Sequence, residues 1–175
     1  MPSFNTLIFA ILMQTFTLFN FTPQSNLSNW RIIDDAVMGG RSDGYFQLNS
    51  EGYGEYTGEI SLKNNGGFSS LHYYFDTLST ASYSKFILKI KGDGKRYQFR
   101  VKDKRSNSHS YIYKFESTKD WQTIEIPFSE MYASFRGRIL DIPNFNGQQM
   151  EEIAFLIGNK KEESFKLLID VISLK

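Results

Sequence analysis

The chain has 175 residues, a formal net charge of +1 and no cysteine. This length fits one domain with a sizeable core, and the near-zero charge excludes a nucleic-acid binder that acts through bulk electrostatics. The lack of cysteine excludes disulfides, thiol nucleophiles and thiolate metal sites. Aromatic residues make up 16% of the chain, which favours strands over helices.

The first segment of interest, residues 4–21, carries no charged side chain. It lacks the Arg-rich pattern of a mitochondrial transit peptide, and polar residues interrupt the apolar run that a membrane span would need. We treat residues 1–14 as an apolar extension with three open alternatives: a signal, an anchor, or a wrongly assigned start ahead of Met13. Residues 15–175 are predicted to form a single β-sandwich domain, with residues 15–21 as its first strand.

From Trp30 onward the apolar residues recur with a period of two, which is typical of strands with one buried face. The predicted strands cover residues 30–33, 45–48, 53–62, 68–75, 85–91, 97–102, 109–115, 121–127, 153–157 and 165–171. Turns rich in Gly and Asn separate them, and the one helical turn that we expect lies near residues 148–152. This pattern predicts an all-β fold, an antiparallel sandwich of jelly-roll type.

The densest local motif is WRIIDDAVMGGRS at residues 30–42. Adjacent carboxylates followed by glycines can bind a hard cation such as calcium, although the spacing differs from that of an EF-hand. The alternative that we favour is a turn in which Asp34 or Asp35 accepts backbone N–H bonds. In that turn Gly39 and Gly40 would take positive φ angles.

Two further glycine-rich segments lie at residues 58–70 and 92–96. The pair Gly66-Gly67 could cradle a phosphate, but no Gly-Lys-Ser/Thr leads into a helix. We therefore predict a tight hairpin turn for each segment.

Basic residues are concentrated in residues 85–105, which contain nine Lys or Arg and two Asp. Because many of them alternate with apolar residues, we expect most of this charge on one face of a sheet. That face is either a docking surface for an acidic protein, an anionic membrane or RNA, or an ordinary solvated face.

The sequence FRGR at residues 135–138 places two guanidinium groups on either side of a glycine. Such a pair can bind carboxylates or phosphates. The alternative is an internal ion pair with Asp34, Asp35 or Asp141.

The case for an enzyme is thin. The two histidines, His72 and His109, lie in predicted strands without a nucleophile motif or a metal motif. A stacking platform for a sugar ring is an alternative, built from Tyr73, Tyr74, Tyr111, Tyr113 and Trp121. Aromatic residues at strand spacing nevertheless belong to a core more often than to a platform.

Six motifs, taken in order, resemble the complex I intermediate-associated protein family. They are W-x4-D-x2-MGG-x-S, NGGFSS, GDG-x2-Y, W-x5-PF, FRGR and F-x3-ID-x-I, at residues 30–42, 65–70, 92–97, 121–128, 135–138 and 165–172. The resemblance implies a galactose-binding-domain-like sandwich, a short bacterial-like member and a non-catalytic chaperone for assembly intermediates of NADH:ubiquinone oxidoreductase. The family-motif positions that form our candidate binding site are Asp34, Asp35, Met38, Gly39, Gly40, Gly66, Gly67, Phe68, Arg136, Gly137 and Arg138. No catalytic residue, metal ligand or cofactor is predicted.

The leading hypothesis is therefore a binding protein for respiratory-complex subunits, with weak membrane-surface contact and no nucleic acid as partner. We expect it to be cytoplasmic or membrane-associated, with export left open. The first alternative is a protein like a carbohydrate-binding module, with a glycan as its ligand. A weaker alternative is an enzyme that acts through Asp34, Asp35 and the pair of arginines at 136 and 138.

Overall fold

The computed structural model describes residues 14–175, which form strands and three short 3-10 helices. The strands are β1 (Phe16–Asn20), β2 (Trp30–Asp34), β3 (Asp43–Leu48), β4 (Gly54–Ile60), β5 (Ser69–Ser79), β6 (Lys85–Lys91), β7 (Arg96–Lys102), β8 (Ser110–Glu116), β9 (Trp121–Pro127), β10 (Tyr132–Phe135), β11 (Arg138–Ile139), β12 (Gln149–Ile157) and β13 (Glu163–Leu174). The 3-10 helices are η1 (Asp35–Met38), η2 (Lys63–Asn65) and η3 (Phe128–Glu130).

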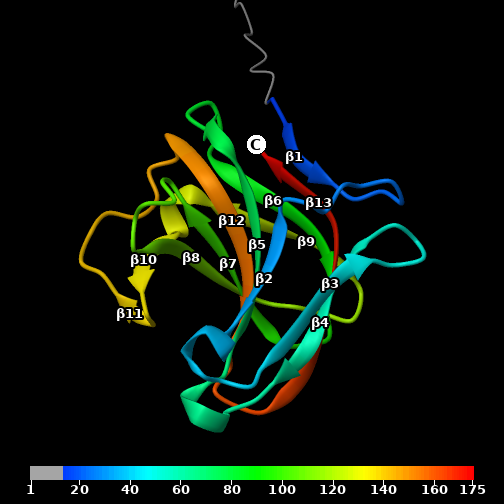
Figure 1. Ribbon diagram of the computed structural model, residues 1–175. Coiled ribbons are helices and arrows are strands. Elements are labelled where there is room, and N and C mark those ends of the chain that lie inside the picture. The colour runs from blue at the N-terminus through cyan, green and yellow to red at the C-terminus, as the bar shows by residue number, and fades with distance from the viewer. Residues whose placement is uncertain (1–13) are drawn as a thin grey trace, which may run out of the picture.

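The strands form two antiparallel sheets that pack face to face (Figure 1). Sheet A has the order β3-β4-β13-β6-β9, and β1 pairs with the end of β13. Sheet B has seven strands in the order β11-β10-β8-β7-β12-β5-β2. The predicted all-β antiparallel sandwich is thereby confirmed.

Aromatic and aliphatic side chains fill the space between the sheets. On β7, Tyr97 and Phe99 are fully buried, and Phe86 and Leu88 on β6 are fully buried opposite them. The rings of Phe86 and Phe99 lie 5.0 Å apart at their centroids, so they join the two sheets directly. The high aromatic content is therefore explained mainly by the core.

The predicted strands 85–91 and 121–127 are confirmed with the same bounds. The helical turn expected near residues 148–152 is wrong, because β12 already begins at Gln149 and pairs there with β5. Met150 of that segment is fully buried, so burial in the sheet decides its structure. Strands β10 and β11 were not predicted because each is very short.

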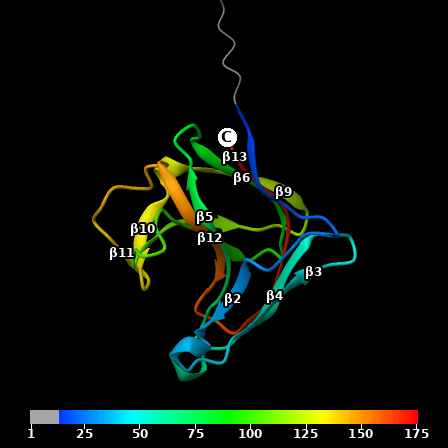
Figure 2. The same ribbon diagram turned by 45° about the horizontal axis from the view of Figure 1, so that its top comes forward.

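The two predicted hairpins are also wrong. Residues 58–70 connect β4 in sheet A to β5 in sheet B, and residues 92–96 connect β6 in sheet A to β7 in sheet B. Both segments therefore cross from one layer to the other, as Figure 2 shows for the connection between β4 and β5. Glycine favours a turn in either case, but it does not determine which sheet the next strand joins.

The basic segment 85–105 is consequently divided between two faces of the molecule. Lys85 and Lys89 lie on β6 in sheet A, whereas Arg96 and Arg100 lie on β7 in sheet B. Because the core sides of β6 and β7 face each other, the charged sides point in opposite directions. The expectation of a single basic face is wrong.

The chain before Trp30 supplies one strand, β1, where residues 15–21 were predicted to form one. The expected extension lies outside the described residues except for Gln14. In residues 14–175, no helix has the length and apolar character needed to cross a membrane.

Candidate functional site

Asp35 is the centre of the loop in the motif at residues 30–42. Its side chain is completely buried. Oδ1 accepts the backbone N–H of Ser42 at 2.9 Å, and Oδ2 accepts the Ser42 hydroxyl at 2.5 Å. Oδ2 also accepts the backbone N–H groups of Gly67 at 2.5 Å and Phe68 at 3.3 Å. One carboxylate thus ties the motif at residues 30–42 to the motif at residues 65–70.

The glycines of both motifs leave room for this carboxylate. A Cβ added to Gly40 would lie 2.2 Å from Asp35 Oδ1, and one added to Gly66 would lie 2.5 Å from Oδ2. Gly39 has a different function, because its φ of 87° ends η1 in the left-handed region. The turn that we favoured from the sequence is present, but close approach rather than positive φ requires glycine at position 40.

The pKa values of the two adjacent aspartates are shifted in opposite directions. Burial raises the pKa of Asp35, but the hydrogen bonds from Ser42, Gly67 and Phe68 outweigh it, so this pKa lies below its usual range. For Asp34, burial is the larger effect and raises the pKa above its usual range, although Ser69 and the N–H of Gly44 oppose it. Asp35 is therefore a stable carboxylate whose two oxygens are already engaged by the protein.

The same loop exposes two apolar side chains. Val37 is 73% exposed and Met38 is 62% exposed, both on η1. The amide of Asn64 donates to the carbonyl of Gly39 at 3.0 Å and holds this loop against η2. Met38 is therefore an apolar member of the predicted set that a protein partner can reach directly.

The arginine pair lies far from this loop. Arg136 and Gly137 form the turn between β10 and β11, with φ angles of 48° and 77°. This hairpin and β2 are at opposite ends of the strand order of sheet B, which corresponds to about 20 Å or more along the sheet. The aspartates and arginines therefore do not form one site, which removes the basis for an enzyme that uses both.

Within residues 14–175, neither Arg136 nor Arg138 forms an ion pair. The guanidinium of Arg136 instead lies 5.3 Å from the centroid of the Phe135 ring. The proposed internal ion pair with Asp34, Asp35 or Asp141 is not formed.

The aromatic residues named for a sugar platform do not gather on one surface. Tyr73, Tyr111 and Tyr113 pack against the core, whereas Tyr74 lies on the outer side of β5. Trp121 is on β9 in sheet A, with its ring 4.6 Å from that of Tyr53. These side chains cannot form a single stacking surface.

One polar cluster was missed by sequence reasoning. His72 Nδ1 lies 2.7 Å from Glu152 Oε1, and His72 Nε2 lies 2.8 Å from the Ser70 hydroxyl. This order of groups is that of a Ser-His-acid triad, but Ser70 is 3% exposed and its hydroxyl donates to the carbonyl of Ile33 at 2.7 Å. The serine proton is thus engaged elsewhere, and the cluster joins β2, β5 and β12. The spacing of Ser70 and His72 was visible in the sequence, but the partner Glu152 was not.

Solved structures with a similar architecture include carbohydrate-binding modules. A family 11 carbohydrate-binding module from Clostridium thermocellum, in complex with a β-1,3-1,4-mixed-linked tetrasaccharide, has a TM-score of 0.63 at 19% identity. The match covers 91% of this chain and 94% of the module. A CBM4 structure has a TM-score of 0.50 at 14% identity, with 87% of this chain and 93% of the other covered. These likenesses show the fold class alone, a two-sheet antiparallel sandwich that resembles the jelly rolls of these modules.

Within that class, the chain belongs to the Complex I intermediate-associated protein 30 (CIA30) family, whose model matches residues 19–169. The mitochondrial protein of that name from Mus musculus is 22% identical, over 94% of this chain and 57% of its own length. The one from Drosophila melanogaster is 23% identical, over 93% of this chain and 63% of its own length. The chain thus spans about three-fifths of these relatives. The resemblance inferred from six motifs is confirmed.

Proposed function

We propose that this protein is a non-catalytic binding protein that assists the assembly of respiratory complex I intermediates. The observation that carries this proposal is the family match over residues 19–169, which spans nearly the whole sandwich. The relatives from mouse and Drosophila are named complex I intermediate-associated proteins, and this role is extended here to the present chain.

The geometry of the motif loop supports a binding function. The fully buried carboxylate of Asp35 has both oxygens engaged by hydrogen bonds and is therefore not free for acid–base chemistry. The loop that it fixes presents Val37 and Met38 to solvent. Exposed apolar side chains on a rigid loop are suited to contact with another protein.

The proposal includes a cytoplasmic location with weak contact at a membrane surface. Such contact could use only one half of the basic segment 85–105 at a time, because β6 and β7 present their charges on opposite faces. In sheet A, Lys85 is already paired with Glu125 at 2.5 Å and Lys89 with Asp170 at 2.7 Å. These pairs weaken the attraction of that face to anionic lipid.

An affinity purification from the native host tests the proposal. We expect the tagged protein to recover subunits of respiratory complex I, and a strain that lacks the gene to contain less assembled complex. A Val37→Ser/Met38→Ser variant should recover less of these subunits, whereas Tyr45→Ser, an exposed apolar residue in β3, serves as the control. Recovery of no respiratory subunits together with normal complex I content in the deletion strain would refute the proposal.

A second candidate function is glycan binding, which is favoured by the fold likeness to the family 11 module. On the outer face of sheet B, Tyr74 on β5 and Tyr132 on β10 are partly exposed, but three strands separate them. Calorimetric titration with the mixed-linked tetrasaccharide distinguishes this candidate. Saturable binding that Tyr74→Ala or Tyr132→Ala abolishes would support it, and no binding would exclude this ligand.

A further inference from the structure

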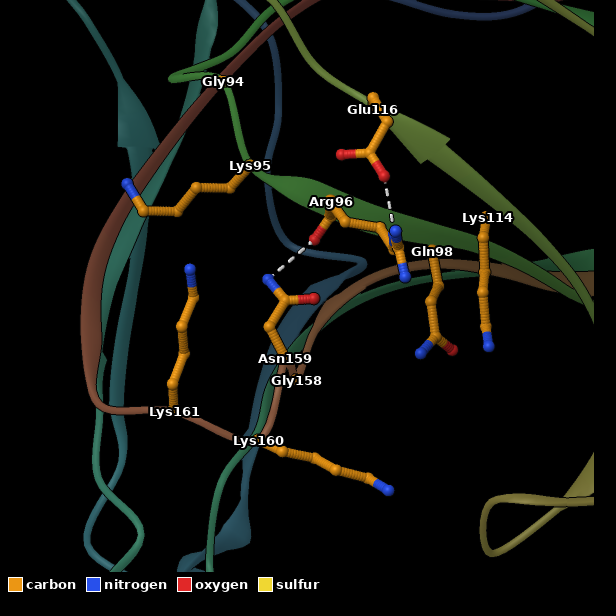
Figure 3. Close-up of a pocket in the computed structure, with 10 residues that line it drawn as sticks. All are labelled: Gly94, Lys95, Arg96, Gln98, Lys114, Glu116, Gly158, Asn159, Lys160 and Lys161. Atoms are coloured by element: carbon orange, nitrogen blue, oxygen red, sulfur yellow. Dashed lines mark hydrogen bonds and ion pairs between the residues drawn. The ribbon is translucent and has the colours of Figure 1, made fainter.

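A basic pocket of about 550 Å³ opens on sheet B, at the start of β7 (Figure 3). Three segments line it: the start of β7 with the turn before it (Gly94, Lys95, Arg96 and Gln98), Lys114 and Glu116 on β8, and the turn between β12 and β13 (residues 158–161). Its volume lies in the range of about 300 to 1,000 Å³ that is usual for ligand pockets. The segments are distant in sequence and meet only through the fold.

The pocket has more positive than negative side chains. Five of its ten lining residues are Lys or Arg, and one is Glu. Three of the cations already have carboxylate partners: Lys95 with Asp93 at 2.9 Å, Arg96 with Glu116 at 2.6 Å and Lys161 with Glu163 at 3.3 Å. Among residues 14–175, the other two, Lys114 and Lys160, form no ion pair and are exposed. The pocket can therefore accept negative charge from a ligand.

Lys160 lies at a turn position whose backbone conformation favours glycine or asparagine over lysine, so the turn itself does not explain the lysine. Its φ is 59°, in the left-handed region, which Gly or Asn adopts at lower cost than a long side chain. In Figure 3, Lys160 extends below Arg96, Gln98 and Lys114, so that the pocket lies between them. A left-handed turn with a lysine at this point provides a cation where a glycine would provide none.

A further cation, Arg100, lies next to the pocket, two residues from Gln98 on the same side of β7. Gln98 faces Lys114 across the β7–β8 pair, and its Oε1 accepts two hydrogen bonds from Arg100, from Nε at 3.0 Å and from Nη2 at 2.8 Å. Within the described residues Arg100 has no carboxylate partner. Burial lowers the pKa of Arg100 to about 10. A partly buried guanidinium without an anion is costly, and an anionic ligand that replaces the amide of Gln98 would relieve that cost.

The lining also limits the kind of ligand. No aromatic ring lines the pocket, so a neutral sugar would have no surface on which to stack. The available groups are ammonium, guanidinium and amide donors, which bind carboxylates well. The cations are spread over three segments rather than gathered at one point, which suits a chain with several carboxylates better than a single small anion.

We propose that this pocket binds an acidic peptide segment of a partner protein, whose carboxylates are held by Lys114 and Lys160 and, behind Gln98, by Arg100. This inference rests on the proposed function and specifies the chemistry of the partner. The buried Asp35 network contributes by positioning one wall of the pocket. A Cβ on Gly158 would lie 3.2 Å from the carbonyl oxygen of Gly67 and 3.2 Å from Cβ of Phe68, so this pocket residue packs directly on the segment that Asp35 holds.

The test is a calorimetric titration of the full chain with a short capped oligoglutamate peptide. We expect saturable binding that weakens as salt is added, because the attraction is between exposed charges. Lys114→Gln/Lys160→Gln should weaken it at least about tenfold, which corresponds to about 1.4 kcal/mol. The matched control is Lys63→Gln/Lys104→Gln, which removes the same charge from exposed residues that do not line the pocket; we expect it to leave the affinity within about twofold.

Three further titrations replace oligoglutamate with an oligoglutamine peptide of the same length, with inorganic phosphate and with an oligogalacturonate. The proposal requires that oligoglutamate bind more tightly than any of them. Absence of saturable oligoglutamate binding, equal weakening by both double variants, or tighter binding of phosphate or oligogalacturonate would each overturn it. Because the titration uses no respiratory subunit, a failed pull-down with intact peptide binding would refute the proposed function alone.

Discussion

Asp35 is a fully buried charged group and Arg100 a partly buried one, and the protein satisfies the two charges very differently. Asp35 accepts hydrogen bonds from Ser42, Gly67 and Phe68 and is fully buried. Arg100 has one side-chain partner, the neutral amide of Gln98. A buried charge with all its hydrogen bonds stabilises the fold, whereas a buried charge without a counter-ion is better explained by a ligand. The Asp35 network therefore stabilises the fold and the loop that exposes Val37 and Met38, whereas the basic pocket is where we expect the acidic segment of a partner to bind.

The largest expected effect is that of Asp35→Asn. The amide nitrogen would face donors that now bond to a carboxylate, and we expect the free energy of unfolding to fall by about 3 kcal/mol or more. Urea denaturation measures this, with Asp120→Asn, an exposed aspartate outside any ion pair in the described chain, as the control at about 0.5 kcal/mol or less. A loss below about 1 kcal/mol for Asp35→Asn would contradict the structural function of the network.

Two neighbouring glycines, Gly39 and Gly40, test whether the Asp35 network needs the space that a glycine leaves. Gly40→Ala would place a Cβ 2.2 Å from Asp35 Oδ1, and we expect a loss of about 2 to 3 kcal/mol from this overpacking. At Gly39, nothing lies within 4 Å of the added Cβ, so the alanine variant should lose only about 1 kcal/mol through its positive φ. Thermal unfolding of the two variants side by side provides the comparison. The reverse order of stabilities would show that space around Asp35 is not the reason for glycine at position 40.

The pH dependence of stability follows from the direction of the Asp35 shift. Its pKa in the folded protein is below the ordinary value of 3.8. The carboxylate therefore contributes stability that is fully present above about pH 4 and is lost as the pH falls through the folded pKa. The difference in unfolding free energy between the wild type and Asp35→Asn should be constant from neutral pH to about pH 5 and shrink below pH 4. A difference that grows on acidification would contradict the assignment.

Arg100→Met should have the smallest effect on stability and the opposite sign. Replacing a desolvated, unpaired guanidinium with an apolar side chain of similar length should leave stability unchanged or raise it by about 1 kcal/mol. The same variant should bind oligoglutamate more weakly than the wild type. Guanidinium denaturation and peptide titration measure the two quantities. A loss of about 2 kcal/mol or more would show that Arg100 is structural, and the contrast with Asp35 would fail.

The alternation of apolar residues was sufficient to predict most strands and the sandwich class, because burial of one strand face leaves a local signal. Connectivity between layers was not predictable from the same signal. The glycines of residues 92–96 indicate a turn whether β7 returns to sheet A or crosses to sheet B. The pocket was missed for a related reason, since Lys114 and Lys160 are adjacent only after β8 and the β12–β13 turn have been placed. The sequence predicted that Asp34 or Asp35 accepts backbone N–H bonds in a turn without distinguishing the two, and the partners Gly67 and Phe68 of Asp35 could not be read from the spacing.

The most direct test of the difference between the Asp35 network and the basic pocket is a backbone amide NMR titration of the wild-type chain with the oligoglutamate peptide. The prediction is that the largest chemical-shift changes occur at residues 94–98 and 158–161 and at Lys114, while the amides of Ser42 and Gly67, which bond to Asp35, change little. Changes concentrated at residues 35–42 and 65–70, with none around Lys160, would contradict it and place the acidic peptide on the family-motif loop instead of in the pocket.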